Sequence, residues 1–546
     1  MSNSSPLTQF LHWEKNTPDR IYLRQPLEGK WKTWTWAEAG NDARCLVKGL
    51  RELGLKKGDH VALLSKNCAQ WIIADIALMM GGFVSVPIYP TLSSHSMRPI
   101  LIHSDAKAII IGKLDDYKEQ QKGIPENMIR IGIKTFGIRE EFSWEDMLNN
   151  QPLAMLTPLD DEEIITIIYT SGTTGITKGA MHTASNFDIT AQAGIPHLEL
   201  PKQADLFSYL PLSHIAERVG SEMYSLYSGC NISFAESIEK FPMNLAQAQP
   251  HVFFGVPRIW TKIREGILAK MSQSVLGFLL SIPGINKLLI KSIKKKLGFS
   301  RTSHFFSGAA PISVELQEWY KKIGINIFQV YGMTEDCCYS HFCCPKAHKF
   351  GTVGKPFPGL LVKISADGEI MEKSGGNMKG YYKEPMLTKE SFDEEGYYKT
   401  GDKGEYDKDG FLKITGRVKD IFKTDKGKYI SPAPIEVKIL SNTDIEYVCV
   451  VGTGVPQPIG LVSLSESGLK KSKENISRSL ELTLKEINPL FEKFEQLAKL
   501  VIMKENWTTA NGKITPSLKV RRNEIEKIHL LSYPHWYKKD GMVIWE

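Results

Sequence analysis

Residues 169–181 read Tyr-Thr-Ser-Gly-Thr-Thr-Gly-Ile-Thr-Lys-Gly-Ala-Met, directly after the β-branched run Ile-Ile-Thr-Ile-Ile at 164–168. That run predicts a buried strand. The strand would lead into a glycine-rich loop whose backbone amides and hydroxyl groups, together with the Lys178 ammonium, can surround an anion such as a polyphosphate. The spacing is not that of the P-loop, in which Gly-Lys-Ser/Thr follows four residues after the first glycine. We therefore expect a nucleotide site in a different fold, with a polar surface loop as the alternative.

The pattern on either side of this loop predicts an α/β protein. At 546 residues the chain is too long for one core, so we expect at least two domains. From residue 59 onward, short apolar strands alternate with helices, which is typical of a doubly wound α/β domain. We predict strands at 61–64, 83–87, 108–111, 206–210, 252–256 and 304–307, and a helix at 69–80. Residues 1–60 look helical, with one helix running from 34 to 50.

Composition excludes several classes of protein. A formal net charge of +7 is mild for this length and gives no case for nucleic-acid binding. We find no secretory signal and no apolar run of the roughly 20 residues that would cross a bilayer. Eight cysteines without an export signal suggest free thiols in a reducing compartment. We therefore expect a cytoplasmic protein, and the sequence leaves open a homodimer.

One segment, 270–300, is unusually basic. No Asp or Glu occurs from 266 to 314, while lysines are frequent. After Pro283-Gly284, apolar residues recur every four positions and most lysines fall on the other side. Such a helix suits peripheral contact with an anionic membrane surface. It equally suits a helix packed on its own domain with a solvated lysine face, and the sequence does not separate the two.

Further motifs follow the glycine loop in a fixed order. They are Leu-Pro-Leu-Ser-His-Ile-Ala-Glu-Arg at 210–218, Ser-Gly-Ala-Ala-Pro at 307–311, Tyr-Gly-Met-Thr-Glu at 331–335, Thr-Gly-Asp at 400–402 and Gly-Arg-Val-Lys-Asp at 416–420. Together with the loop they resemble the adenylate-forming enzymes, which include acyl-CoA synthetases, luciferases and the adenylation domains of peptide synthetases. The resemblance spans about residues 10–525. Thr177 stands where that family usually has proline, which would only stiffen the loop.

The resemblance implies a large N-terminal domain of doubly wound sheets over 1–418 and a small, mobile α+β domain over 419–546, with a hinge at Lys419. It also implies a two-step reaction. A carboxylic acid attacks the α-phosphate of ATP with Mg²⁺ present and pyrophosphate leaves, and the thiol of coenzyme A then attacks the acyl-adenylate.

The same resemblance implies the site residues. It places ATP or AMP against Thr170, Ser171, Gly172, Thr173, Thr174, Gly175, Gly308, Ala309, Ala310, Gln329, Tyr331, Gly332, Asp402 and Arg417. It gives catalytic roles to Lys178, Thr334, Glu335 and Lys519, and magnesium to Thr174 and Glu335. His214 would lie beside the carboxylate of the acyl substrate, whereas Glu217 and Arg218 can simply pair with neighbours.

Two lysines compete for the catalytic role in the C-terminal domain. Aligning Thr515, Ser517 and the arginine pair at 521–522 with the family motif favours Lys519. Lys513, which follows a glycine as the family lysine often does, is the second candidate. Leu518 replaces that glycine.

The chain resembles most the long-chain fatty acyl-CoA synthetases, so we expect a long-chain fatty acid as the substrate. The alternatives are another carboxylic acid, a carrier-protein thiol as acceptor, or a non-catalytic lipid- or nucleotide-binding relative. The resemblance does not explain the four cysteines at positions 337, 338, 343 and 344. Their adjacent spacing is poor for zinc, which leaves a neutral or redox-sensitive lining as the main interpretation.

Overall fold

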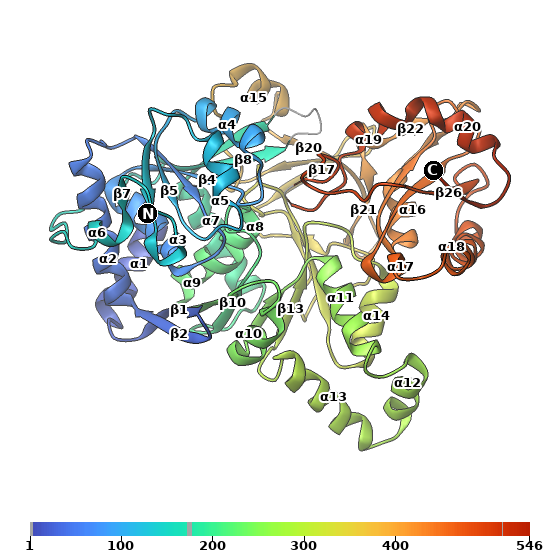
Figure 1. Ribbon diagram of the computed structural model, residues 1–546, viewed down its shortest axis with the longest axis horizontal. Coiled ribbons are helices and arrows are strands. Elements are labelled where there is room, and N and C mark those ends of the chain that lie inside the picture. The colour runs from blue at the N-terminus through green and yellow to red at the C-terminus, as the bar shows by residue number, and fades with distance from the viewer. Residues whose placement is uncertain (1–3, 172–176, 516) are drawn as a thin grey trace.

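The glycine-rich stretch lies at the edge of the largest sheet in the computed structural model, which describes residues 4–171, 177–515 and 517–546 (Figure 1). This sheet has eight strands in the order β19-β9-β8-β4-β3-β5-β6-β7. The run from β8 to β7 is parallel, and β9 and β19 add antiparallel strands at one edge. The strands are β3 (His60–Leu64), β4 (Val84–Ile88), β5 (Ala106–Ile111), β6 (Ile129–Gly132), β7 (Phe142–Ser143), β8 (Ile164–Ser171), β9 (Thr177–Thr183) and β19 (Gly380–Tyr381).

Helix α3 (Ala69–Gly81) is buried along its whole length, as its almost entirely apolar sequence requires. It packs against α2 (Trp36–Glu52), which begins after Thr35. The Thr35 side chain accepts from the backbone of Glu38, whose carboxylate in turn accepts from Thr35, so a capping box fixes the helix start.

The prediction of a helical N-terminal segment is wrong between the first two helices. Residues 21–35 form a hairpin of β1 (Ile21–Leu27) and β2 (Lys30–Thr35). Its two-residue turn, Glu28-Gly29, has positive φ at both positions, the geometry that matches the twist of a tight hairpin. Helix α1 (Pro6–Asn16) precedes it, and α2 starts two residues later than predicted.

Two further sheets complete the wall of the large domain. One has the order β10-β11-β1-β2 and the other β12-β13-β14-β15-β16. Their remaining strands are β10 (Asp205–Ser208), β11 (Asn231–Phe234), β12 (Val252–Phe254), β13 (His304–Ser307), β14 (Ile327–Tyr331), β15 (His341–Phe342) and β16 (Lys355–Pro356). The predicted strands at 61–64, 83–87, 108–111, 206–210, 252–256 and 304–307 all coincide with strands of the structure within a few residues.

The C-terminal part is a smaller α+β unit beside the large domain (Figure 1, right). A four-stranded sheet, β17-β18-β20-β21, leads towards it: β17 (Leu361–Ile364), β18 (Glu369–Lys373), β20 (Tyr398–Tyr406) and β21 (Leu412–Arg417). The unit itself is built on β24 (Ile445–Val451), β25 (Ile459–Leu464), β26 (Lys499–Ile502) and β27 (Val543–Trp545). Helices α16 (Pro432–Ile439) and α18 (Lys473–Ile487) pack on this sheet. The expected α/β class is confirmed.

A buried ion cluster sits between α3 and the 210–218 segment. The side chains of Arg218, Asp75 and Glu222 have no exposed surface. Arg218 donates to Asp75, to Glu222 at 3.3 Å and to the Thr166 hydroxyl of β8 at 2.6 Å. Arg218 thus pairs with its neighbours and ties the segment carrying His214 to the central sheet.

Arg218→Met is expected to lower the free energy of unfolding by about 3 to 5 kcal/mol, because it leaves two buried carboxylates without a cation. Urea unfolding of both proteins measures this change. Arg98→Met, at an exposed helical arginine, serves as the control and should unfold like the wild type. Equal midpoints for R218M and R98M would contradict the structural role of Arg218.

Candidate active site

The described residues of the glycine-rich stretch belong to two strands, β8 and β9. Strands β8 and β9 pair antiparallel, with Thr170 opposite Lys178. The sequence predicted the first strand and the loop but not the return strand. Gly172, Thr173, Thr174 and Gly175 lie outside the described residues, as does the side chain of Ser171.

Lys178 lies near the carboxylate of Glu335. Its ammonium lies 5.0 Å from the centre of the Tyr381 ring, and the Tyr381 hydroxyl donates to Glu335 at 2.9 Å. Burial lowers the pKa of Lys178, Glu335 opposes that shift, and the cation of Lys419 adds to it. Nothing in the glycine- and lysine-rich sequence around Tyr381 singled out this residue.

Asp402 is held from two sides. Its carboxylate accepts from Arg417 Nε at 2.6 Å and from the Tyr331 hydroxyl at 2.8 Å. Asp402 and Arg417 are direct partners on the antiparallel strands β20 and β21. The Asp402 charge raises the pKa of the Arg417 guanidinium. Burial, followed by the same charge, raises the pKa of Tyr331. A donor–acceptor cluster therefore forms from motifs about 70 residues apart.

Small residues line the floor near Tyr331. Gly308, Ala309 and Ala310 follow β13, whose register places Ser307 beside Gln329 of β14. Ala309 adopts a left-handed φ of 64°. A Cβ on Gly332 would lie 2.7 Å from the Cα of Cys338, so no side chain fits there.

Two hydrogen bonds between Thr515 and Lys519 hold the loop that carries Lys519. The amide of Lys519 donates to the Thr515 hydroxyl at 3.0 Å, and the Thr515 amide donates to the Lys519 carbonyl at 2.7 Å. Leu518 adopts a left-handed φ of 62°, at the position where the resembling family has glycine. Desolvation in the cleft lowers the pKa of Lys519, and the guanidinium of Arg417 lowers it further.

Lys513 lies elsewhere. Its side chain is buried, and its ammonium pairs with Glu505 at 2.6 Å. Lys519 lines the cleft, whereas Lys513 does not.

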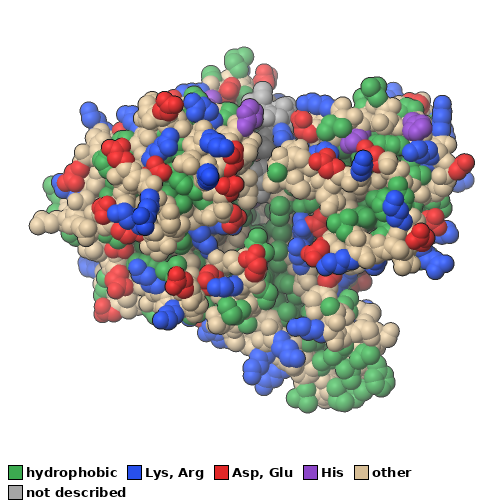
Figure 2. Space-filling model, viewed as in Figure 1, with side chains coloured by type: hydrophobic (Ala, Val, Ile, Leu, Met, Phe, Trp, Pro, Cys, Tyr) green, Lys and Arg blue, Asp and Glu red, His purple; other side chains and the backbone are tan. Residues whose placement is uncertain are grey.

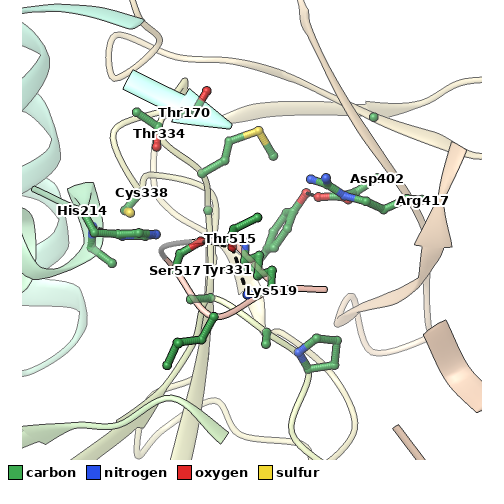
Figure 3. Close-up of a pocket in the computed structure, with 18 of the residues that line it drawn as sticks. Thr170, His214, Tyr331, Thr334, Cys338, Asp402, Arg417, Thr515, Ser517 and Lys519 are labelled. Atoms are coloured by element: carbon green, nitrogen blue, oxygen red, sulfur yellow. Dashed lines mark hydrogen bonds and ion pairs between the residues drawn. The ribbon is translucent and has the colours of Figure 1, made fainter. Parts of the chain in front are cut away.

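His214 approaches the same cleft from the opposite side. Its Nδ1 accepts from the Ala216 amide at 3.1 Å. Burial, with the nearby cation of Lys519, lowers the pKa of His214 to about 4, so the ring is neutral at pH 7. Figure 3 shows His214 and Cys338 on one side, Asp402 and Arg417 on the other, and Lys519 between them.

These groups share one cleft of about 1950 Å³. Of the residues named from sequence, it is lined by Thr170, Lys178, His214, Ala309, Ala310, Gln329, Tyr331, Gly332, Thr334, Glu335, Asp402, Arg417, Lys419 and Lys519. Gly308 is buried just behind the lining. Part of the wall of the cleft is apolar, with contributions from Ala191, Leu198, Val219, Val252, Phe254 and Phe306.

The unexplained cysteines are thiols in this structure. Cys337, Cys343 and Cys344 are buried, and Cys338 reaches the cleft. Burial raises the pKa of Cys337 to about 12 and also raises that of Cys338, which keeps both protonated and poorly reactive. Among the described residues, no three His, Cys, Asp or Glu side chains are grouped to hold a metal.

A contact between the two domains was not foreseen from the sequence. Arg258, in helix α11 (Pro257–Leu268), forms an ion pair with Glu446 and donates to the Tyr447 hydroxyl of β24 at 2.5 Å. Lys438 of α16 pairs with Glu315 of α14 (Val314–Lys322). Lys419 itself is exposed in the short turn Val418–Asp420, which follows β21.

Comparison with solved structures supports the fold. The adenylation domain of a carboxylate reductase from Mycobacterium chelonae superposes with a TM-score of 0.81 at 20% identity, covering 99% of this chain and 92% of that one. An o-succinylbenzoate CoA synthetase from Bacillus subtilis, in complex with its acyl-adenylate intermediate, superposes with a TM-score of 0.75 at 22% identity. The match covers 96% of this chain and 99% of that one. The same enzyme has been solved with ATP and a magnesium ion, and that structure superposes with a TM-score of 0.71 at 22% identity. The match covers 95% of this chain and 99% of that one.

Comparison with the sequences of known proteins identifies the family of this chain. A long-chain-fatty-acid–CoA ligase from Mycobacterium bovis is 28% identical, covering 94% of this chain and 93% of that protein. A second such ligase, from Xenopus laevis, is 27% identical, and the match covers 96% of this chain and 82% of that protein. The AMP-binding enzyme family matches residues 10–382, and the AMP-binding enzyme C-terminal domain matches residues 419–530. The chain therefore belongs to the AMP-binding, adenylate-forming enzymes.

Proposed function

We propose that this enzyme activates a long-chain fatty acid with ATP, forms an acyl-adenylate, and transfers the acyl group to coenzyme A. One observation carries the proposal: a lysine from the C-terminal domain enters a cleft that already contains the Asp402–Arg417 pair, Lys178 and His214. The long-chain assignment draws further support from the curated ligases at 27–28% identity.

The adenosine end of the nucleotide would lie at Tyr331 and Asp402. The Tyr331 ring and the small residues 308–310 offer flat contact for a base. The carboxylate of Asp402, oriented by Arg417 and Tyr331, can accept from ribose hydroxyls. The phosphates would extend towards Lys178 and Thr334, and Thr170 with residues 171–175 would supply further contacts to them.

The carboxylate of Glu335, at the phosphate end of the proposed nucleotide site, fits a magnesium ion. Glu335 is half-buried, receives one hydrogen bond from Tyr381, and lies close enough to Lys178 to affect the pKa of that lysine. A carboxylate beside phosphate oxygens is the ligand type Mg²⁺ prefers, and Thr174 would be the other protein ligand. When bound, the ion would neutralise charge on the phosphates.

Lys519 would bring the two reactants together. Its cation lowers the pKa of His214, and the guanidinium of Arg417 lowers the pKa of Lys519, so Lys519 lies within electrostatic reach of both. A carboxylate placed between His214 and Lys519 would face the α-phosphate, and the cation would stabilise the negative charge shared by the two groups. The apolar part of the cleft wall would take the hydrocarbon chain.

The second step would require the C-terminal domain, 419–546, to turn about Lys419 so that coenzyme A can reach the acyl-adenylate. The Arg258–Glu446 and Lys438–Glu315 pairs would then have to separate. Both pairs are partly exposed, so breaking them is inexpensive in free energy.

Pyrophosphate release from ATP and Mg²⁺, measured over acids from acetate to oleate, tests the substrate assignment. We expect release with long-chain acids only, and multiple turnovers only when coenzyme A is added. Release with short or aromatic acids would discard the fatty-acid assignment. Turnover with a carrier-protein thiol but not with coenzyme A would rule out coenzyme A as the acyl acceptor.

Gly220 offers a test of the acyl wall. It lines the cleft within the segment Arg218–Met223, and nothing lies within 4 Å of the position where a Cβ would be. Gly220→Leu should fill this space and shift the preference towards shorter acids, at least tenfold in kcat/KM for oleate relative to decanoate. Gly266→Leu is the matched control, because Gly266 is equally open and lies outside the cleft. An unchanged chain-length profile in G220L would place the acyl chain elsewhere.

A further inference from the structure

The basic segment 270–300 forms a helical arm below the large domain (Figure 1). Helices α12 (Gln273–Ser281) and α13 (Ile285–Leu297) are joined by a tight turn at Pro283-Gly284. We propose that the end of this arm is a docking surface for an anionic lipid bilayer. The proposal concerns adhesion alone and does not require the fatty-acid assignment.

The inner face of the arm packs on its own domain. Leu276 is buried in a core with Trp260 and Trp319, and Trp319 Nε1 donates to Gln273 at 2.8 Å. Leu289, Ile293 and Leu297, which recur every four residues, pack against the same core. Three residues of the stripe seen in the sequence therefore pack internally, as the second of the two sequence interpretations expected, whereas its first residue, Ile285, is 43% exposed. The arm is held in place and is not a loose extension.

A second apolar set points outward. Val275, Phe278, Ile285 and Leu288 are 49%, 67%, 43% and 71% exposed, and all four belong to the two helices around the turn. Figure 2 shows a hydrophobic patch at the lower end of the molecule, where Figure 1 places α12 and α13. Single exposed apolar residues are ordinary, but four large ones gathered at the end of a projecting arm indicate a surface that becomes covered.

Exposed cations lie beside this patch. Lys287, Lys291, Lys295 and Lys296 of α13 are exposed, and Figure 2 shows basic side chains beside the patch. Lys294 differs, because it is half-buried with its ammonium 5.8 Å from the Phe305 ring. No Asp or Glu occurs between 266 and 314. The exposed surface of the arm therefore combines apolar side chains with net positive charge.

Apolar side chains together with net positive charge favour an anionic bilayer as the partner of this surface. Apolar side chains enter the boundary between headgroups and acyl chains, while lysines beside them meet anionic phosphates. A second copy of the chain would bring the same lysines against each other, and like charges in contact oppose such pairing. The charge is complementary only to a negative partner.

Sedimentation with vesicles tests the proposal without ATP or acid, so failure of the catalytic proposal would leave the result intact. The probes are vesicles of phosphatidylcholine alone and of phosphatidylcholine mixed with phosphatidylglycerol. We expect binding to the anionic vesicles, weakened by salt. Lys287→Glu with Lys291→Glu should lower partitioning more than about tenfold, since each lysine near such a surface contributes roughly fivefold. Phe278→Ser with Leu288→Ser should also weaken binding.

Matched controls lie far from the arm in the sequence. Leu531→Ser removes a side chain that is 94% exposed, and Lys118→Glu with Lys538→Glu reverses two exposed lysines. These variants should bind vesicles like the wild type, and all variants should keep the wild-type melting temperature. No binding to anionic vesicles, equal binding to neutral ones, equal loss in the controls, or dimerisation through the arm in size-exclusion chromatography would overturn the proposal.

Discussion

Positive charge gathered in one cleft is the constraint on which the arrangement of the molecule depends. Lys178 comes from the central sheet, Arg417 from the last strand before the C-terminal domain, and Lys519 from that domain itself. Burial, followed by the neighbouring cations, lowers the pKa values of Lys178 and Lys519. Asp402 and Glu335 offset part of this repulsion. A polyanion in the cleft would relieve the rest, which is consistent with the proposed binding of ATP and a carboxylate between the two domains.

Much of this could be predicted from the sequence because its strongest signals are local. Buried strands appear as short apolar runs, and polar motifs at the carboxyl ends of strands meet at one edge of a sheet. Thr170 of β8 and Gln329 and Tyr331 of β14 lie on two such strands, but the strands belong to different sheets, and only the folded chain brings these residues to one cleft. Tyr381 and Arg258 could not be found in this way, since their roles come from partners at Glu335 and Glu446 that only the folded chain brings near.

The basic arm shows the same limit. Its four-residue repeat was visible in the sequence, but whether that stripe faced the protein or a partner depended on packing against Trp260 and Trp319. The outward set at Phe278 and Leu288 has no periodicity of its own, because it combines two helices across a turn. The β1–β2 hairpin was missed for a related reason, since β1 is held in part by β11, about 200 residues away.

The most direct test of the account is ATP–pyrophosphate exchange in Lys519→Ala beside Lys513→Ala. We predict that K519A loses exchange by about a hundredfold or more yet still binds ATP, because Asp402, Arg417 and Lys178 remain. K513A should keep exchange near the wild-type rate, since Lys513 pairs with Glu505 outside the cleft. Wild-type exchange in K519A, or its loss in K513A alone, would contradict the claim that Lys519 joins the two anions.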